Sequence, residues 1–207
     1  MKKLPFSALL AALLALLSAA PSSGGPLDGH VDAFGGFTGS VAFDDGLGLE
    51  GYIDFAVFTS SDFNANYSGL GYVPGDALVY TYQIESEGDM DITALKVFLG
   101  GAAANTIGSF GPLVAGAIVP FTAGFDPSDA KWVFDPPLDG VSYGLAYSSP
   151  VLPGIGSFEV FGGRSSSLVA LGVPVPGADS VPVPEPATIL LLGGGLVIHA
   201  RRRFRRR

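Results

Sequence analysis

Few side chains in this 207-residue sequence could act as nucleophiles or general bases. The sequence has no cysteine and only two histidines, His30 and His199. Histidine is the usual general base, while thiolates or paired histidines are typical of nucleophilic triads and zinc centres. Serines are plentiful, but none lies in a Gly-x-Ser-x-Gly sequence. These residue types argue against a triad or a zinc site, and we expect no enzyme activity and no cofactor.

Carboxylates are the remaining candidates for chemistry, and they occur in pairs within turn-like sequences. The pairs are Asp44 with Asp45, Asp89 with Asp91, and Asp126 with Asp129. Oxygen donors clustered on turns are possible ligands for a structural Ca²⁺, although none of the pairs fits the Asp-x-Asp-x-Asp-Gly calcium loop. We expect ordinary solvated turns here, with Ca²⁺ as the alternative. A glycoside hydrolase, which needs two acids about 5 to 10 Å apart, stays open as an alternative function.

One polar and aromatic segment could bind a ligand. The stretch "SSDFNANYSGLGY", residues 60–72, contains Asn64, Asn66, Tyr67 and Tyr72. Tyrosine rings stack on sugars, and asparagine amides hydrogen-bond to them. The segment therefore predicts a ligand loop of a carbohydrate-binding module, with an ordinary hairpin loop as the alternative.

The elements that would position these residues have a hydrophobic period of two. In "ALVYTYQIES", the even-numbered positions 78–84 are Leu, Tyr, Tyr and Ile, and the odd-numbered positions are mostly polar; "VSYGLAYSS", residues 141–149, repeats the pattern. Such alternation is typical of half-buried strands. Further strands are predicted at 51–59, 91–100, 130–135, 156–162 and 167–175, with weaker signals at 36–43 and 116–122. Glycines on both sides of 100–108 favour a loop there.

These strands predict an all-β chain. Eight or nine short strands separated by Gly, Pro, Asn and Asp are typical of an antiparallel β-sandwich, which we place at residues 26–173. The 30 glycines and 16 prolines of the sequence indicate many turns. Trp132, the one tryptophan, is expected to anchor the core.

The charge of the chain is distributed unevenly. Between Pro26 and Pro184, 18 acidic residues stand against three basic ones, Lys96, Lys131 and Arg164, which gives a net charge of −15. Such a field repels phosphate backbones. The body is therefore not expected to bind nucleic acid.

The N-terminus has the order of a secretory signal peptide. Lys2 and Lys3 precede an apolar run at 9–17, and small residues follow. This order predicts a signal helix within residues 1–25 that is handled by the secretion translocon and signal peptidase. Because Pro21 next to the scissile bond would fit a peptidase badly, we expect the cut after Ala19 or within 22–25.

The C-terminus has three consecutive parts after a proline-rich linker at 174–183. Pro184, Glu185 and Pro186 come first, and a 14-residue apolar stretch runs from Ala187 to Ala200. As a helix it would be about 21 Å long, short for a hydrocarbon layer of roughly 30 Å, so it predicts a weak membrane span. The last part is an arginine cluster, which predicts retention of the C-terminus in the cytoplasm by the positive-inside rule. The cluster consists of Arg201, Arg202, Arg203, Arg205, Arg206 and Arg207.

The segment 184–207 resembles the PEP-CTERM sorting signal of exported proteins from Gram-negative bacteria. That resemblance implies recognition by an exosortase, a multi-pass membrane enzyme, and a membrane anchor that lasts only until processing. The 26–173 region is also loosely similar to the β-rich ectodomains of many PEP-CTERM proteins. A plain tail anchor is the competing interpretation, and it leaves the Pro-Glu-Pro segment without a purpose.

Together these patterns predict an exported protein of the cell surface or extracellular matrix. Its β-sandwich would serve a structural or adhesive role in an exopolysaccharide or biofilm setting, with extracellular polysaccharide as a possible partner. The carbohydrate-binding module and the carboxylate glycoside hydrolase are the alternatives.

Overall fold

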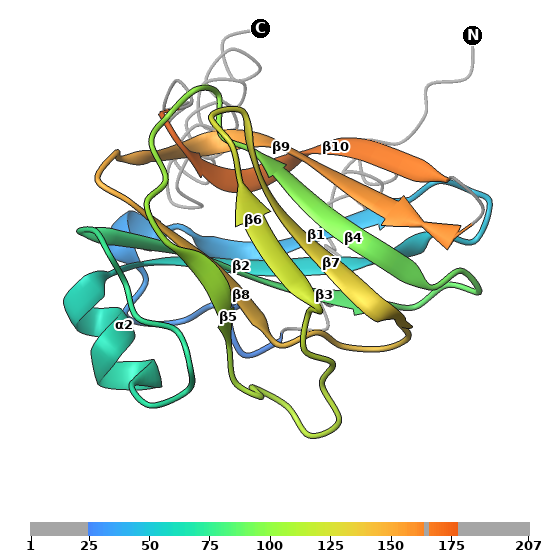
Figure 1. The fold of residues 1–207 in the computed structure, drawn as a ribbon, viewed down its shortest axis with the longest axis horizontal. Helices are drawn as coiled ribbons and strands as arrows, with labels where there is room; N and C mark the ends of the chain where they lie inside the picture. The colour runs from blue at the N-terminus through green and yellow to red at the C-terminus, as the bar shows by residue number, and fades with distance from the viewer. Residues whose placement is uncertain (1–24, 164–165, 178–207) are drawn as a thin grey trace, which may run out of the picture.

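The computed structural model describes residues 25–163 and 166–177. Within these ranges the chain forms a 3₁₀ turn, η1 (Phe34–Gly36), one short helix and ten strands (Figure 1). The elements after η1 are β1 (Thr38–Asp44), β2 (Glu50–Thr59), α2 (Ser60–Tyr67), β3 (Leu78–Ser86), β4 (Ile92–Phe98), β5 (Ile107–Phe110), β6 (Thr122–Phe125), β7 (Asp129–Leu138), β8 (Gly144–Ser149), β9 (Pro153–Gly162) and β10 (Ser167–Pro176).

The strands form two five-stranded sheets. Sheet A has the order β1-β2-β3-β8-β5, and sheet B has the order β10-β9-β4-β7-β6. All strand pairs within them are antiparallel. In Figure 1 the diagonal strands β4, β6 and β7 of sheet B lie in front of the more horizontal β1, β2 and β3 of sheet A. The arrangement is sandwich-like, as the alternating sequence patterns predicted.

The predicted number of strands was slightly too small. The sequence predicted eight or nine strands, and the described part of the chain has ten. Strand β5 begins at Ile107, inside the stretch predicted to be a loop, and the weak signal at 116–122 ends where β6 begins. Both β5 and β6 have only four residues and include a glycine, so neither is long enough to show a clear alternation.

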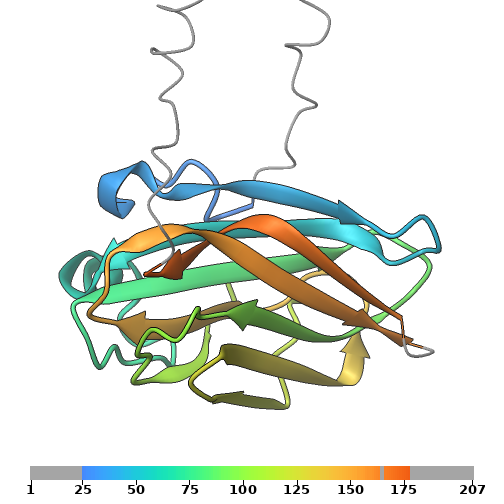
Figure 2. The same cartoon turned by 90° about the horizontal axis from the view of Figure 1, so that it is seen from above.

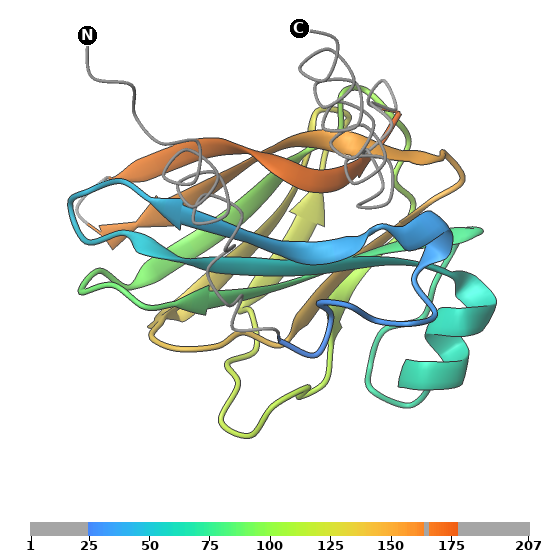
Figure 3. The ribbon, with the colours of Figure 1, turned by 180° about the vertical axis from the view of Figure 1, so that it is seen from behind.

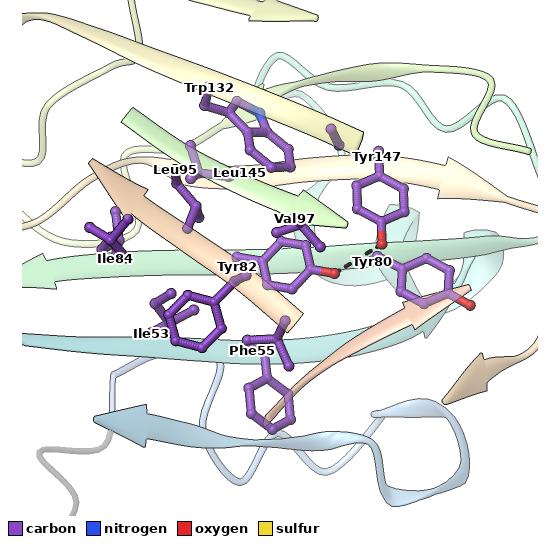
Figure 4. Close-up of a cluster of buried hydrophobic side chains, with 14 of the residues drawn as sticks. Ile53, Phe55, Tyr80, Tyr82, Ile84, Leu95, Val97, Trp132, Leu145 and Tyr147 are labelled. Atoms are coloured by element: carbon purple, nitrogen blue, oxygen red, sulfur yellow. Dashed lines mark hydrogen bonds between the residues drawn. The ribbon is translucent and has the colours of Figure 1, made fainter. Parts of the chain in front are cut away.

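The main core lies between the two sheets and is rich in aromatic side chains (Figure 4). Trp132 of β7 is fully buried, as predicted, and its indole N–H donates to the Gly108 carbonyl at 2.8 Å. Its ring packs against the rings of Tyr82 and Tyr147, whose hydroxyl oxygens are 3.0 Å apart. Large buried rings whose polar atoms are hydrogen-bonded hold the two sheets together.

A second, smaller core covers the other face of sheet A. Its members include Leu27 from the N-terminal segment, Phe63 and Tyr67 from α2, and Phe58 and Val79 from the sheet. Figure 2 shows α2 at one end of the sandwich, and Figure 3 shows the blue N-terminal segment lying outside the central strands of sheet A. Because both faces are covered, β3 is buried from Leu78 to Ile84, not half-buried as its alternation predicted.

The last strand changes face at a bulge. The pairing of β10 with β9 shifts register between Leu171 and Val173, and Gly172 has a φ of +134°, which favours glycine. Before the bulge Leu171 points outward and is 74 % exposed, whereas Val173 after it is fully buried.

The pairing of β10 with β9 also corrects the predicted start of the linker. Residues 174–176 were assigned to the proline-rich linker, but they pair with β9 and are buried. A proline-containing segment fits here because β10 is an edge strand, where one side of the backbone needs no ladder partner.

Candidate functional site

The predicted ligand loop is mainly a helix. The side chain of Thr59 caps α2 by accepting a hydrogen bond from the Asp62 N–H at 3.2 Å. The rings of Tyr67 and Tyr72 lie in the smaller core and are 8 % and 6 % exposed. The Tyr72 hydroxyl is also held by the Thr106 hydroxyl at 2.7 Å. Neither ring is free to stack on a sugar, because α2 turns Tyr67 toward the sheet and the Thr106 hydroxyl holds Tyr72 in the smaller core.

The two asparagines of the segment do lie on the surface. Asn64 and Asn66 are exposed, and the Asn66 amide donates to the Asp62 carbonyl at 2.8 Å and to the Asp32 carboxylate at 3.1 Å. The structure therefore separates the predicted set into two exposed amides and two buried rings. It does not assemble the aromatic and amide surface that the sequence suggested.

Three of the six paired carboxylates, Asp44, Asp45 and Asp126, bind the backbone of their own turns. Asp45 accepts from the Leu47 and Leu49 N–H groups at 2.7 and 3.0 Å, and these bonds lower its pKa. Asp126 accepts from the Ser128 hydroxyl and from the Ser128 and Asp129 N–H groups, and these bonds lower its pKa as well. These bonds are the usual role of Asp in turns.

The carboxylate pairs are not joined by further metal ligands in the part of the chain that the structure describes. No group of three or more His, Asp or Glu side chains gathers to hold a metal ion within residues 25–163 and 166–177. The structural Ca²⁺ stays a prediction.

The buried tyrosines have a structural role. Burial raises the pKa of Tyr80, Tyr82 and Tyr147, so their hydroxyls stay protonated. The Tyr80 hydroxyl donates to the Val151 carbonyl at 2.7 Å. A protonated phenol committed to a backbone carbonyl is a packing element and not a general acid.

The outer face of sheet B gathers the cationic side chains of the body that the structure describes. Lys96 on β4 and Lys131 on β7 are register neighbours. Their ammonium nitrogens lie 5.3 and 5.0 Å from the centre of the Phe161 ring. Lys96 also pairs with Glu159 at 2.7 Å. Sequence reasoning missed this face, because the residues come from three strands whose register is not evident in the sequence.

A shallow groove adjoins this face at the sheet edge. It is lined by residues 122–126 together with Asp129, Lys131 and Val133. Phe125 within it is 42 % exposed, and Phe121 beside it is 67 % exposed. The outer face of sheet B thus combines aromatic rings with two lysines, of which Lys131 also lines the groove at the sheet edge.

The C-terminal signal lies outside the described residues. The body ends at Gly177, whose N–H donates to the Leu152 carbonyl at 3.1 Å. The PEP-CTERM protein-sorting motif matches residues 182–207. The chain carries a PEP-CTERM sorting motif. No curated protein and no solved structure matches the chain.

This motif confirms the resemblance seen in the tail and implies exosortase processing. It implies export and a transient C-terminal membrane anchor as well. The predicted motif residues 184–186, the span from Ala187 to Ala200 and the arginine cluster all fall inside the match. Among the described residues, no helix is long and apolar enough to cross a membrane.

The predicted signal peptide also lies almost entirely outside the described residues, which begin at Gly25. Its existence stays a prediction from the order of its charged, apolar and small residues.

Proposed function

We propose that this protein is an exported, non-catalytic β-sandwich that an exosortase releases or attaches at the cell surface or in the extracellular matrix. The observation that carries this proposal is the sorting motif at residues 182–207, which follows a folded all-β body that ends at Gly177. The body would be the cargo, and the tail would direct its sorting.

The order of the parts supports one topology. The signal peptide would send the acidic body across the inner membrane, and the terminal arginines would stay in the cytoplasm. Nine residues, 178–186, separate Gly177 from the start of the apolar stretch at Ala187, so at roughly 3.3 Å per residue the anchored body would lie within about 30 Å of the membrane surface.

The folded body would have to be stable outside the cell without disulfides. It has no cysteine to form them, and its stability comes from two cores that contain most of its aromatic rings. Asp44, Asp45 and Asp126 hold turns, and the buried tyrosines serve packing, which supports a structural or adhesive role over catalysis.

Mass spectrometry of the protein recovered from an exosortase-containing host tests this function. We expect a mature C-terminus upstream of the arginine cluster, within or near Pro184 to Pro186. The same chain made in a host without exosortase should keep Arg207. An intact Arg207 in both hosts would rule out processing.

A second candidate function, polysaccharide binding, is favoured by the outer face of sheet B. The exposed Lys131 beside the half-buried ring of Phe161 gives an anionic sugar polymer a positive charge and an apolar contact, while the charge of Lys96 is shared with Glu159. This candidate replaces the Ser60–Tyr72 segment as the place where a polysaccharide would bind, since Tyr67 and Tyr72 are buried.

A further inference from the structure

A buried carboxylate lies on the outer face of sheet A. Asp54 is in the middle of β2, and its register neighbours are Ser40 on β1 and Gln83 on β3. Its side chain is only 5 % exposed, because the N-terminal segment covers it. Burying a carboxylate costs several kcal/mol unless a cation or several donors compensate.

Asp54 is not fully compensated by the side chains around it. Its Oδ1 and the neighbouring Ser40 hydroxyl are both buried without a hydrogen-bond partner. Gln83 uses its amide N–H to donate to the Ser142 carbonyl at 2.9 Å, which leaves its Oε1 as a further acceptor. The donors that face Asp54 are the Ser40 hydroxyl and the Gly25 N–H, and both lower its pKa, yet its Oδ1 is buried without a hydrogen bond of ordinary geometry.

Gly25 lies directly against this site. A Cβ atom built on Gly25 would come within 1.8 Å of Asp54 Oδ2 and 3.5 Å of Gln83 Oε1. Only glycine brings its backbone so close, and the Gly25 N–H points to the Asp54 carboxylate and lowers its pKa. Gly25 thus lies against the carboxylate whose Oδ1 has no hydrogen-bond partner.

The charges around Asp54 favour a cation at the nitrogen of Gly25. Desolvation raises the pKa of Asp54, and the negative charge of Asp28 adds to the rise. Asp54 in turn helps to raise the pKa of Glu85. Lys96 and Lys131, the lysines of the described body, both lie on sheet B. Within the described residues, no lysine or arginine forms an ion pair with Asp54.

We propose that signal peptidase cuts between Gly24 and Gly25 and that the new α-ammonium group of Gly25 binds Asp54. Hydrolysis adds water across that peptide bond, so Gly24 leaves with a carboxylate and Gly25 gains an amine that is protonated at neutral pH. The ammonium has three N–H donors where the amide had one, and Asp54 Oδ1, Asp54 Oδ2 and Gln83 Oε1 are there to accept them. This inference rests on the export part of the proposed function.

The sequence around the bond suits the peptidase. Ser22 and Gly24 provide small residues at the third and first positions before the cut, and Pro26 is not at the scissile bond. Among the cuts that the sequence left open, this one alone gives the nitrogen that faces Asp54 a positive charge. Processing would thereby complete the buried site, and the mature body would be more stable than its precursor.

Two measurements on the full chain, exported from a Gram-negative host, test the proposal. The N-terminal mass should begin at Gly25. Reductive methylation, which labels only neutral amines, should then show an α-amine that titrates at least one unit above the ordinary range of about 7.7 to 8.0. Labelling at pH 7.5 should therefore be at least ten-fold slower than for Asp54→Asn, with Lys131 as the internal rate standard.

A control variant separates an effect of Asp54 from a general effect of removing a carboxylate. Asp44→Asn, in an exposed turn on the neighbouring strand, should leave the α-amine labelling rate unchanged. A different N-terminal residue, or an α-amine that titrates at 8 or below in the wild type, would overturn the proposal even if Asp54→Asn fails to fold. The C-terminal mass of the same sample reports exosortase processing separately, so the two ideas can fail independently.

Discussion

The Tyr82 hydroxyl of sheet A donates a hydrogen bond to the Pro174 carbonyl of β10, the last strand of sheet B. Because the Tyr82 proton is used there, Tyr147 is the donor in the 3.0 Å contact between the two phenols. Both tyrosines are fully buried. A short chain of hydrogen bonds thus crosses the core and fixes the strand from which the sorting tail departs.

Replacing Tyr82 with phenylalanine should weaken this connection. Tyr82→Phe removes one hydroxyl and leaves the Pro174 carbonyl and the Tyr147 hydroxyl without their partner in a dry core. We expect the free energy of unfolding to fall by about 1 to 3 kcal/mol, as measured by urea denaturation. Tyr52→Phe, on the partly exposed part of β2, is the matched control and should change it by less than about 0.5 kcal/mol.

Removing the ring of Tyr67 should affect stability and not sugar binding. Tyr67 packs its ring against Phe58, Phe63 and Phe110 in the smaller core. Tyr67→Ala should therefore lower the free energy of unfolding by about 3 kcal/mol. The exposed Asn64→Ala is the control and should be nearly neutral. If Tyr67→Ala abolished binding to a polysaccharide at unchanged stability, the helix would have to be reinterpreted as a ligand site.

The difference between the predicted loop and the observed helix shows what the sequence could reveal. Strands β3 and β8 were predicted because the apolar residues of 78–84 and 141–147 alternate over seven positions. Helix α2 is short and rich in Ser, Asp and Asn, which are weak helix formers. The one signal that could have revealed it was Thr59 three positions before Asp62, a capping arrangement.

The buried Asp54 site and the lysine pair on sheet B became evident only with the strand register. Asp54 resembles any other strand residue until β1 and β3 place Ser40 and Gln83 beside it. Lys96 and Lys131 are 35 positions apart in sequence and become neighbours through the pairing of β4 with β7. The sorting motif could be recognised from the sequence, because its three parts are consecutive and need no tertiary contact.

Acid should weaken the turn that follows β1. The hydrogen bonds from Leu47, Leu49 and Ser166 lower the pKa of Asp45 below its ordinary value of 3.8. A carboxylate with a lowered folded-state pKa stabilises the fold above its unfolded pKa, and this stability is lost as the pH falls through the folded value. The difference in Tm between wild type and Asp45→Ala should be largest near neutral pH and should shrink below about pH 4. A difference that stays constant down to pH 2 would contradict this role of the charge.

Processing of the tail should depend on Glu185 and on the positive charge of the terminal arginines. Glu185→Ala should leave the body folded, since the described body ends at Gly177, but should leave the C-terminus unprocessed. Changing all six terminal arginines to lysine keeps the charge and should preserve retention, whereas changing them to serine should not. Mass spectrometry and cell fractionation report both results. Glu87→Ala, in a turn of the body, is the control, and equal processing of Glu185→Ala and wild type would contradict recognition of Glu185.

Charge on the outer face of sheet B should control polysaccharide binding. Lys131 is exposed and lies 5.0 Å from the Phe161 ring, so Lys131→Glu reverses a charge without breaking a buried ion pair. We expect binding to an acidic polysaccharide such as alginate to fall about ten-fold, and wild-type binding to weaken as salt rises, because exposed charges are screened. Lys131→Arg keeps the charge and should bind like wild type. The matched variant Asp135→Lys adds a positive charge on the same strand, outside the Lys96 and Phe161 cluster. If Asp135→Lys restored the binding lost in Lys131→Glu, net charge alone and not this face would be responsible.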